Sequence, residues 1–207
     1  MKPICESSVR LARLSDTEVS VNRRALKIVQ KLVENPDKFN VTVKQTGKGT
    51  TLIDAGIKAD GGFQTGKKIV EICLGGYGKA EIVPVAYEGL MLSSVFVYTN
   101  RPAVSTLGSQ FADWQIKRDD FSAIGSGPAR ALVRRNKELY EKVGYRDESE
   151  DAVLVLETGN EPPEPVIEDI AKECGVQPKR LFLILVPTAS VAGSTQVSGR
   201  IVETGLH

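Results

Sequence analysis

The sequence predicts a mixed α and β fold, with a β-rich, partly antiparallel first half and a parallel strand–helix–strand–helix unit in the second half. In that second half, apolar strand patterns at residues 151–157 and 180–187 alternate with a helical pattern at residues 163–175, and a last helix is expected to begin near Gly193. Such alternation indicates parallel pairing of the strands. The unbroken apolar run at residues 181–186 also indicates a strand that is covered on both faces.

The first half contains the signals of an amphipathic helix and of antiparallel strand pairs. Apolar residues recur at helical spacing over residues 21–33, behind the possible caps Ser20 and Asn22. Two short strand-like runs flank a GKG turn at residues 47–49, which predicts a hairpin. The other expected elements are a helix over residues 63–74 and strands over residues 80–87 and 92–99, the first of these strands at an edge or bulge because it contains Pro84.

The middle of the chain, from residue 100 to residue 128, is expected to be rich in loops. A single helix is predicted over residues 128–143, because Pro128 suits a first helical turn and Gly144 follows the last periodic position.

We expect the chain to divide into a polar N-terminal extension, residues 1–19, and two α/β subdomains, residues 20–110 and 111–207. The last helix has no capping glycine, proline or polar tail before His207. The second subdomain is therefore expected to lack its C-terminal part.

Composition and charge exclude several classes of function. Of the 207 residues, 41% are hydrophobic and 26% are charged, as in ordinary globular proteins. The 27 basic and 26 acidic residues give a net charge of +1, and no basic run is present, so we expect no nucleic-acid partner. Because no apolar segment reaches the length of a signal peptide or a membrane span, we expect no membrane partner and a cytoplasmic location.

The cysteines and the histidine argue against a metal site. Three widely spaced cysteines indicate reduced thiols, and Cys73 and Cys174 occupy apolar positions of helical patterns, where core packing is expected. The only histidine is His207, and no metal-binding motif is present. We therefore expect no metal ion, and chemistry that uses carboxylates, arginine, lysine, hydroxyls and backbone groups.

The last helix has a narrow polar stripe. When residues 194–207 are wound as an α-helix, Gln196, Arg200, Glu203 and His207 fall within an arc of about 60°. The rest of the circumference is apolar or small, so the helix is expected to be largely buried. Spacing alone allows an Arg200–Glu203 ion pair at a subunit or domain contact, or a ligand pocket at the carboxyl end of the preceding strand.

Two glycine-rich segments do not satisfy the known nucleotide-binding motifs. The segment LGGYG at residues 74–78 and the segment GSGPAR at residues 125–130 fit neither the Rossmann fingerprint nor Walker A. The second segment is open to two interpretations, a tight turn or an anion-binding site that includes Arg130. Phe111 and Trp114 are likewise open to core packing or to stacking on a flat ligand.

Five collinear blocks of sequence resemble the methenyltetrahydromethanopterin cyclohydrolases of methanogens and methylotrophs. The blocks are SVN at 20–22, EICLGG at 71–76, RPAVSTLGSQFADWQIK at 101–117, AIGSGPARAL at 123–132 and PTASVAGSTQVSGRIVET at 187–204. The resemblance implies two mixed α and β domains with a pterin in the cleft between them, and a homo-oligomer, commonly a trimer. It implies reversible hydrolysis of the methenyl derivative of tetrahydromethanopterin to the N5-formyl derivative, with the pterin as substrate and no further cofactor.

The resemblance also assigns roles to residues. The catalytic glutamate of the family and the arginine three positions before it fall on Glu203 and Arg200. Glu203 would take a proton from the attacking water, and Arg200 would favour the ionised carboxylate. The residues expected to bind substrate are Gln196, Ser126, Arg130, Ser109, Gln110 and Phe111.

Two positions depart from the archaeal pattern of this family, and two other hypotheses remain open. The two positions are Phe111 after GSQ and Asp113 before the tryptophan, and the aromatic residue suggests the methylotrophic branch. A non-catalytic pterin-binding or assembly subunit could share the scaffold, and the polar stripe could be purely an oligomer contact.

Overall fold

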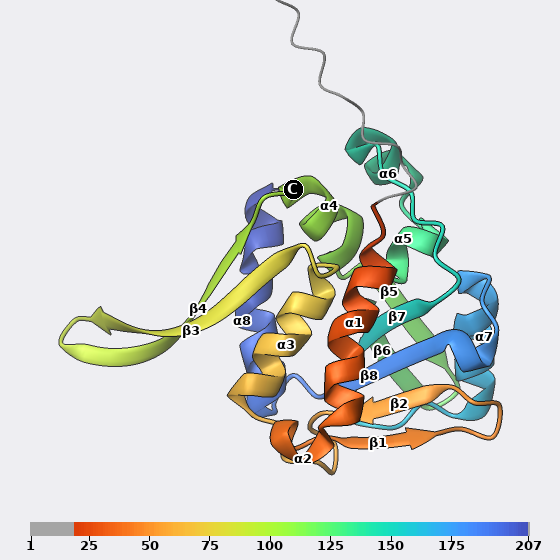
Figure 1. Ribbon diagram of the computed structural model, residues 1–207, viewed down its shortest axis with the longest axis horizontal. Helices are drawn as coiled ribbons and strands as arrows, with labels where there is room; N and C mark the ends of the chain where they lie inside the picture. The colour runs from red at the N-terminus through yellow and green to blue at the C-terminus, as the bar shows by residue number, and fades with distance from the viewer. Residues whose placement is uncertain (1–18, 207) are drawn as a thin grey trace, which may run out of the picture.

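The computed structural model describes residues 19–206, which form one six-stranded mixed sheet, the helices around it and a separate two-stranded hairpin (Figure 1). The sheet order is β1-β2-β8-β7-β6-β5. Its strands are β1 (Thr42–Gln45), β2 (Thr51–Asp54), β5 (Trp114–Arg118), β6 (Phe121–Ser126), β7 (Ala152–Glu157) and β8 (Leu181–Val186). β2, β8 and β7 run in parallel, and the outer pairs are antiparallel. The expected mixed fold, the hairpin around residues 47–49 and the parallel unit are confirmed.

Helices cover both faces of the central strands. α1 (Val21–Glu34) and α3 (Phe63–Cys73) lie on one face, and α7 (Glu164–Cys174) lies on the other. Successive residues of a strand point to opposite faces, so Leu154 packs toward α7 whereas Val153 and Val155 pack toward α1 and α3. All three are fully buried, which explains the apolar run without alternation. Cys73 and Cys174 are buried free thiols, as expected.

β3 (Gly78–Tyr87) and β4 (Leu90–Thr99) form a long antiparallel hairpin that projects from the body of the protein (Figure 1). Pro84 pairs with Ser93 in a ladder of two strands, where its missing N–H needs no partner on the outer side. The expected edge position of Pro84 is therefore confirmed.

Two expectations for the middle of the chain are wrong. Residues 100–128 contain α4 (Pro102–Ser105), a π-helical turn η2 (Thr106–Gln110) and the antiparallel pair β5–β6 in place of a loop. Asp119 takes the left-handed conformation that closes the β5–β6 turn. The single helix expected over residues 128–143 is divided into α5 (Arg130–Val133) and α6 (Lys137–Val143), because Arg134 is left-handed and Asn136 caps a new helix.

The expected boundary between residues 110 and 111 stays a prediction. The main sheet joins strands from both sides of it, since β1 and β2 pair through β8 with β7, β6 and β5. The N-terminal extension lies outside the described residues, apart from Val19. Within residues 19–206, no helix combines the length and apolar character that a membrane span requires.

Asn22 ties the start of α1 to the sheet. Ser20 is the helix cap, and its hydroxyl accepts a hydrogen bond from the Arg23 N–H. Asn22 is fully buried, and its side chain donates to the Pro128 carbonyl and accepts from the Val153 N–H, at 2.9 and 3.0 Å. The position expected as a cap therefore joins three distant segments.

α8 (Val191–Leu206) follows β8, runs past the carboxyl edge of the sheet and packs closely against α3 (Figure 1). A Cβ atom at Gly66 would lie 2.5 Å from Thr195 Cβ and 2.7 Å from the Ala192 carbonyl oxygen. A Cβ atom at Gly199 would lie 2.6 Å from a methyl group of Val70. Two glycines thus set the distance between the helices.

We predict that Gly66→Ala lowers the melting temperature. The new methyl group would overlap the backbone of α8, and overpacking of this kind costs about 1–3 kcal/mol. Thermal unfolding followed by circular dichroism measures the effect, with Gly159→Ala as the matched control because a Cβ atom there meets nothing within 4 Å. An unchanged or raised melting temperature for Gly66→Ala would contradict the close packing of the two helices.

Candidate functional site

The polar stripe of α8 faces the interior of the protein. Gln196 is fully buried, and Arg200 and Glu203 are each 8% exposed. Val197 and Ile201 lie on the opposite side and are 42% and 75% exposed, so the expectation of a largely buried helix is wrong for these two apolar positions. The charged side chains point inward because they find partners there. His207 lies outside the described residues.

Arg200 is shared by two carboxylates. It forms an ion pair with Glu157, the last residue of β7, and its Nη2 lies 3.6 Å from Glu203 Oε1. Glu157 was not identified from the sequence. The available signal was an acidic residue that closes an otherwise apolar strand, at the sheet edge where ligands gather in α/β folds.

The π-helical turn η2 delivers two buried polar side chains to α3 and α8. The Ser109 hydroxyl donates to the Cys73 carbonyl at 2.6 Å, and the Gln110 amide donates to the Gly199 carbonyl at 3.5 Å. π-helical turns are rare in proteins, and those that occur are often found at functional sites. The turn therefore places Ser109 and Gln110 beside the stripe of α8.

Buried polar atoms without a hydrogen-bond partner gather around these side chains. Within the described part of the chain they are Gln110 Oε1, Gln196 Nε2, Gln196 Oε1, Glu203 Oε2 and Glu157 Oε1, and one further such atom, Glu164 Oε1, lies apart from them at the start of α7. Leaving a buried polar atom unpaired costs about 1–3 kcal/mol, and such atoms need an explanation in a native structure. A ligand or ordered water at this position would satisfy them.

Arg130 organises the segment that precedes β5. Its side chain is buried, forms an ion pair with Asp113 at 2.5 Å and donates to the carbonyl groups of Leu107 and Ser109, both at 3.3 Å. Its guanidinium also lies 5.3 Å from the centre of the Phe111 ring. These contacts engage Arg130 within the protein, so its geometry is that of a residue that positions residues 107–113.

The GSGPAR segment forms a tight turn. Gly127 has a φ of +99°, and its N–H donates to the Ser109 carbonyl at 3.0 Å. Ser126 is buried, and its hydroxyl lies 3.8 Å from the Cys73 sulfur. Trp114 is in the main core, with 1% of its surface exposed, so core packing is the correct interpretation for this residue.

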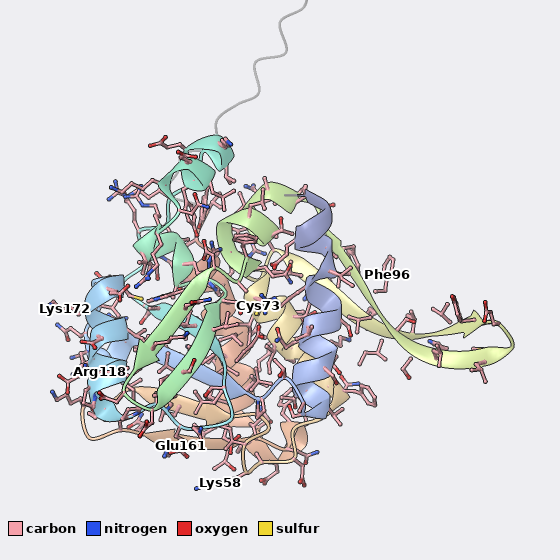
Figure 2. The ribbon with its side chains drawn as sticks, turned by 180° about the vertical axis from the view of Figure 1, so that it is seen from behind. Lys58, Cys73, Phe96, Arg118, Glu161 and Lys172 are labelled. Carbon is pink, nitrogen blue, oxygen red and sulfur yellow. The ribbon has the colours of Figure 1, made fainter. Side chains whose placement is uncertain are left out.

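Burial and neighbouring charges act in opposite directions on Glu203. Desolvation raises the pKa of its carboxyl above the ordinary value, while Arg200, Arg130 and the Ala112 N–H favour the ionised form and limit the rise. Burial also raises the pKa of the Cys73 thiol, labelled on α3 in Figure 2, to about 11. The thiol is therefore neutral near pH 7, which leaves Glu203 as the better base.

The structure brings together all the residues that the sequence assigned to the site. Contacts connect Arg200 and Glu203 on α8, Ser109 and Gln110 on η2, Phe111 directly after η2, and Arg130 on α5. Gln196 lies one turn before Arg200 on the same buried face, and Ser126 joins through Cys73. Among residues 19–206 no cluster of three or more His, Cys, Asp or Glu side chains fits a metal ion, and the absence of a metal stays a prediction.

We predict that Glu203→Gln stabilises the fold at neutral pH. The raised pKa means that the folded protein binds this proton more tightly than the unfolded chain, so the stability of the parent protein falls as pH rises from about 4.5 through the folded pKa. A neutral amide avoids this loss. The melting temperature of the variant minus that of the parent should therefore increase with pH over this range and then level off.

Melting curves from pH 4 to pH 8 test this expectation. Glu168→Gln is the control, because Glu168 is a half-exposed carboxylate that pairs with Lys48 and its removal should produce no such increase. A difference between Glu203→Gln and the parent that stays constant with pH would contradict the predicted effect of burial.

The family model for Cyclohydrolase (MCH) matches residues 20–207 of this chain. Three relatives named methenyltetrahydromethanopterin cyclohydrolase come from Methanocaldococcus jannaschii, Methanothermobacter marburgensis and Methylobacillus flagellatus, and they are 44%, 44% and 43% identical. The alignments each cover 91% of this chain and 59%, 60% and 57% of the respective relatives, so the chain spans less than two thirds of their length.

The comparisons bear on the family but not on its branches. The nearly equal identities to the methanogen and the methylotroph proteins favour neither branch. The match of the family model extends over every residue that the sequence assigned to the site. The chain belongs to the Cyclohydrolase (MCH) family.

Proposed function

We propose that this chain carries the catalytic carboxylate of a methenyltetrahydromethanopterin cyclohydrolase, which reversibly hydrolyses the methenyl derivative to the N5-formyl derivative. The family and the printed names of the three relatives support this substrate. The single observation that carries the mechanism is the state of Glu203. One carboxylate oxygen faces Arg200, and the other is buried without a hydrogen-bond partner among the described residues.

The proposed reaction needs an oriented nucleophile more than an activated electrophile. The methenyl carbon lies between two nitrogens in an amidinium-like cation and is already electrophilic. Water held by Glu203 Oε2 attacks this carbon, a C–O bond forms, and one water proton passes to the carboxylate. The C–N bond to the second nitrogen then breaks, that nitrogen takes the hydroxyl proton, and the formyl group stays on N5. Glu203 returns its proton to solvent.

The environment of Glu203 suits a general base. Burial raises the pKa of its carboxyl, which makes the carboxylate a stronger base than an exposed one. Arg200 keeps that carboxylate ionised, and the cationic substrate would add to the effect. In the reverse direction the protonated Glu203 supports the loss of water.

The remaining site residues are proposed to hold and orient the substrate. Gln196 and Gln110 have unpaired amide atoms that can meet polar groups of a pterin or the attacking water. Phe111, whose ring lies 5.3 Å from the Arg130 guanidinium, and the hydroxyls of Ser109 and Ser126 lie in the same region. Arg130 contributes by fixing this segment through Asp113 and the backbone carbonyls.

We predict that Glu203→Gln removes hydrolysis and leaves substrate binding largely intact. Loss of a positioned general base lowers kcat by about 10²- to 10⁴-fold. Decay of the absorbance of the methenyl chromophore measures turnover, and titration of the substrate measures affinity. Glu168→Gln serves as the matched control and should retain parental turnover. Near-normal turnover in Glu203→Gln would refute the assignment, and a parent protein that binds the pterin without converting it would favour the non-catalytic binding subunit.

We also propose a homo-oligomer, with a trimer as the expected number, in which the β3–β4 hairpin contributes to the contact. The hairpin projects from the fold and carries many exposed large apolar side chains, of which Phe96 is labelled in Figure 2. The set comprises Val85, Tyr87, Leu90, Met91, Leu92, Phe96 and Tyr98. Clustered apolar exposure of this kind marks interaction surfaces. A cytoplasmic location belongs to the same proposal, and cell fractionation tests it.

We predict that Met91→Lys lowers the mass of the oligomer. A charge placed in an apolar contact loses its hydration without gaining a partner, which weakens association. Sedimentation equilibrium measures the mass, and Phe63→Lys is the control because Phe63 is an exposed apolar residue outside the hairpin. An unchanged mass for Met91→Lys would exclude the tip of the hairpin from the contact.

A further inference from the structure

Glu157 occupies a rigid place beside the base proposed above. It ends β7, directly after five fully buried apolar residues, 152–156. Its backbone pairs with Ile124 on one side and with Val186 on the other, so the strand end is held from both sides. The side chain is 10% exposed and forms an ion pair with Arg200. A carboxylate at this position has little freedom to move.

We propose that Glu157 is a positioning residue that holds the guanidinium of Arg200 and thereby keeps one oxygen of Glu203 available for the attacking water. This inference rests on the proposed function, because it names how the arginine of that site is controlled.

The geometry of the three side chains supports this role. An arginine can engage a carboxylate through two parallel hydrogen bonds when nothing else competes for it. Here Arg200 makes its closer contact with Glu157, while its distance to Glu203 is 3.6 Å, beyond the usual range of a hydrogen bond. Glu203 Oε2 consequently has no hydrogen-bond partner among the described residues. Glu157 thus limits the pairing between Arg200 and the base.

The charges around Glu203 determine the sign of the expected effect. Arg200 on its own helix, Arg130 on α5 and the Ala112 N–H favour the ionised form, and the Cys73 thiol on α3 is neutral near pH 7. Glu157 on β7 is the carboxylate that reaches the same guanidinium. Its removal leaves Arg200 free to act fully on Glu203, which favours the ionised base and lowers the pKa of Glu203.

The test is Glu157→Gln, with kcat and KM measured across pH. The acid limb of the kcat profile should move to lower pH by about one unit, because the nearby guanidinium is no longer shared. A base that is weaker and partly covered by Arg200 should also lower kcat by about ten- to a hundredfold, with little change in KM. Glu161→Gln is the matched control and should keep the parental profile, because Glu161 is a partly exposed carboxylate four residues further along that pairs with Lys44 (Figure 2).

Glu157→Asp separates charge from reach. The aspartate side chain keeps the negative charge, so the acid limb of the kcat profile should stay near its parental position. Because it is shorter and lies further from Arg200, Glu157→Asp should lower kcat, but by less than Glu157→Gln does. If Glu157→Gln does not fold, the aspartate variant decides the matter through kcat at a retained melting temperature. An unchanged kcat in the folded aspartate variant, or an unmoved acid limb in the folded glutamine variant, would overturn the positioning role.

A second measurement separates this inference from the proposed function. The melting temperature of Glu203→Gln minus that of its parent, followed against pH, reports the pKa of Glu203 without any turnover. In a Glu157→Gln background the rise of this difference should occur at lower pH. If the parent protein does not convert the methenyl substrate, the proposed function fails. The inference about Glu157 is then tested by this measurement alone. A rise of the melting-temperature difference at lower pH supports the inference, and a rise at unchanged pH overturns it.

Discussion

The close approach of α8 to α3 determines where every polar group of the candidate site lies. Gly66 and Gly199 lack the Cβ atoms that would hold the two helices apart. α8 can therefore run along the carboxyl edge of the sheet with Arg200 and Glu203 turned inward. The same approach brings the Gly199 carbonyl to the Gln110 amide, which connects α8 to the π-helical turn. A bulkier helix contact would move the base away from its partners.

The stability of the site and its chemistry oppose each other. Two carboxylates share one arginine in a largely buried setting, and burying ionised groups costs free energy unless they are fully paired. Glu203 remains incompletely paired, and unpartnered amide atoms belong to Gln196 on the same helix and to Gln110 on η2. An inert core would favour apolar side chains in these positions. Their presence is consistent with a site that is stabilised when water and substrate fill it, a pattern typical of enzymes that trade stability for function.

Local sequence patterns predicted much of the fold and the polar face of α8. They failed where the structure depends on contacts between segments that are distant in the sequence. The periodicity of α8 placed Gln196, Arg200 and Glu203 on one face, because helical geometry is local. The ion pair with Glu157 joins residues 43 positions apart and follows from the sheet order, which no local pattern contains. Likewise, the break between α5 and α6 depends on a left-handed Arg134, a conformation that has no sequence signal. The strands β5 and β6 are short and are joined by a turn of two aspartates, so the sequence pattern resembled a loop.

α8 buries its charged side chains and exposes apolar ones, and this arrangement gives the ion pair between Arg200 and Glu157 a second structural role. A helix with exposed apolar side chains such as Val197 and Ile201 and buried charges would be expected to turn about its axis, since the hydrophobic effect favours the opposite arrangement. Specific contacts between α8 and its neighbours must therefore hold the helix against this rotation. The ion pair between Arg200 and Glu157 does so from the sheet, and the glycine contacts do so from α3. α8 also contacts β4, and both elements carry exposed apolar side chains, which form a surface of the kind that partners cover. Covering that surface would favour the orientation in which the base points inward, and association would then support the geometry of the site.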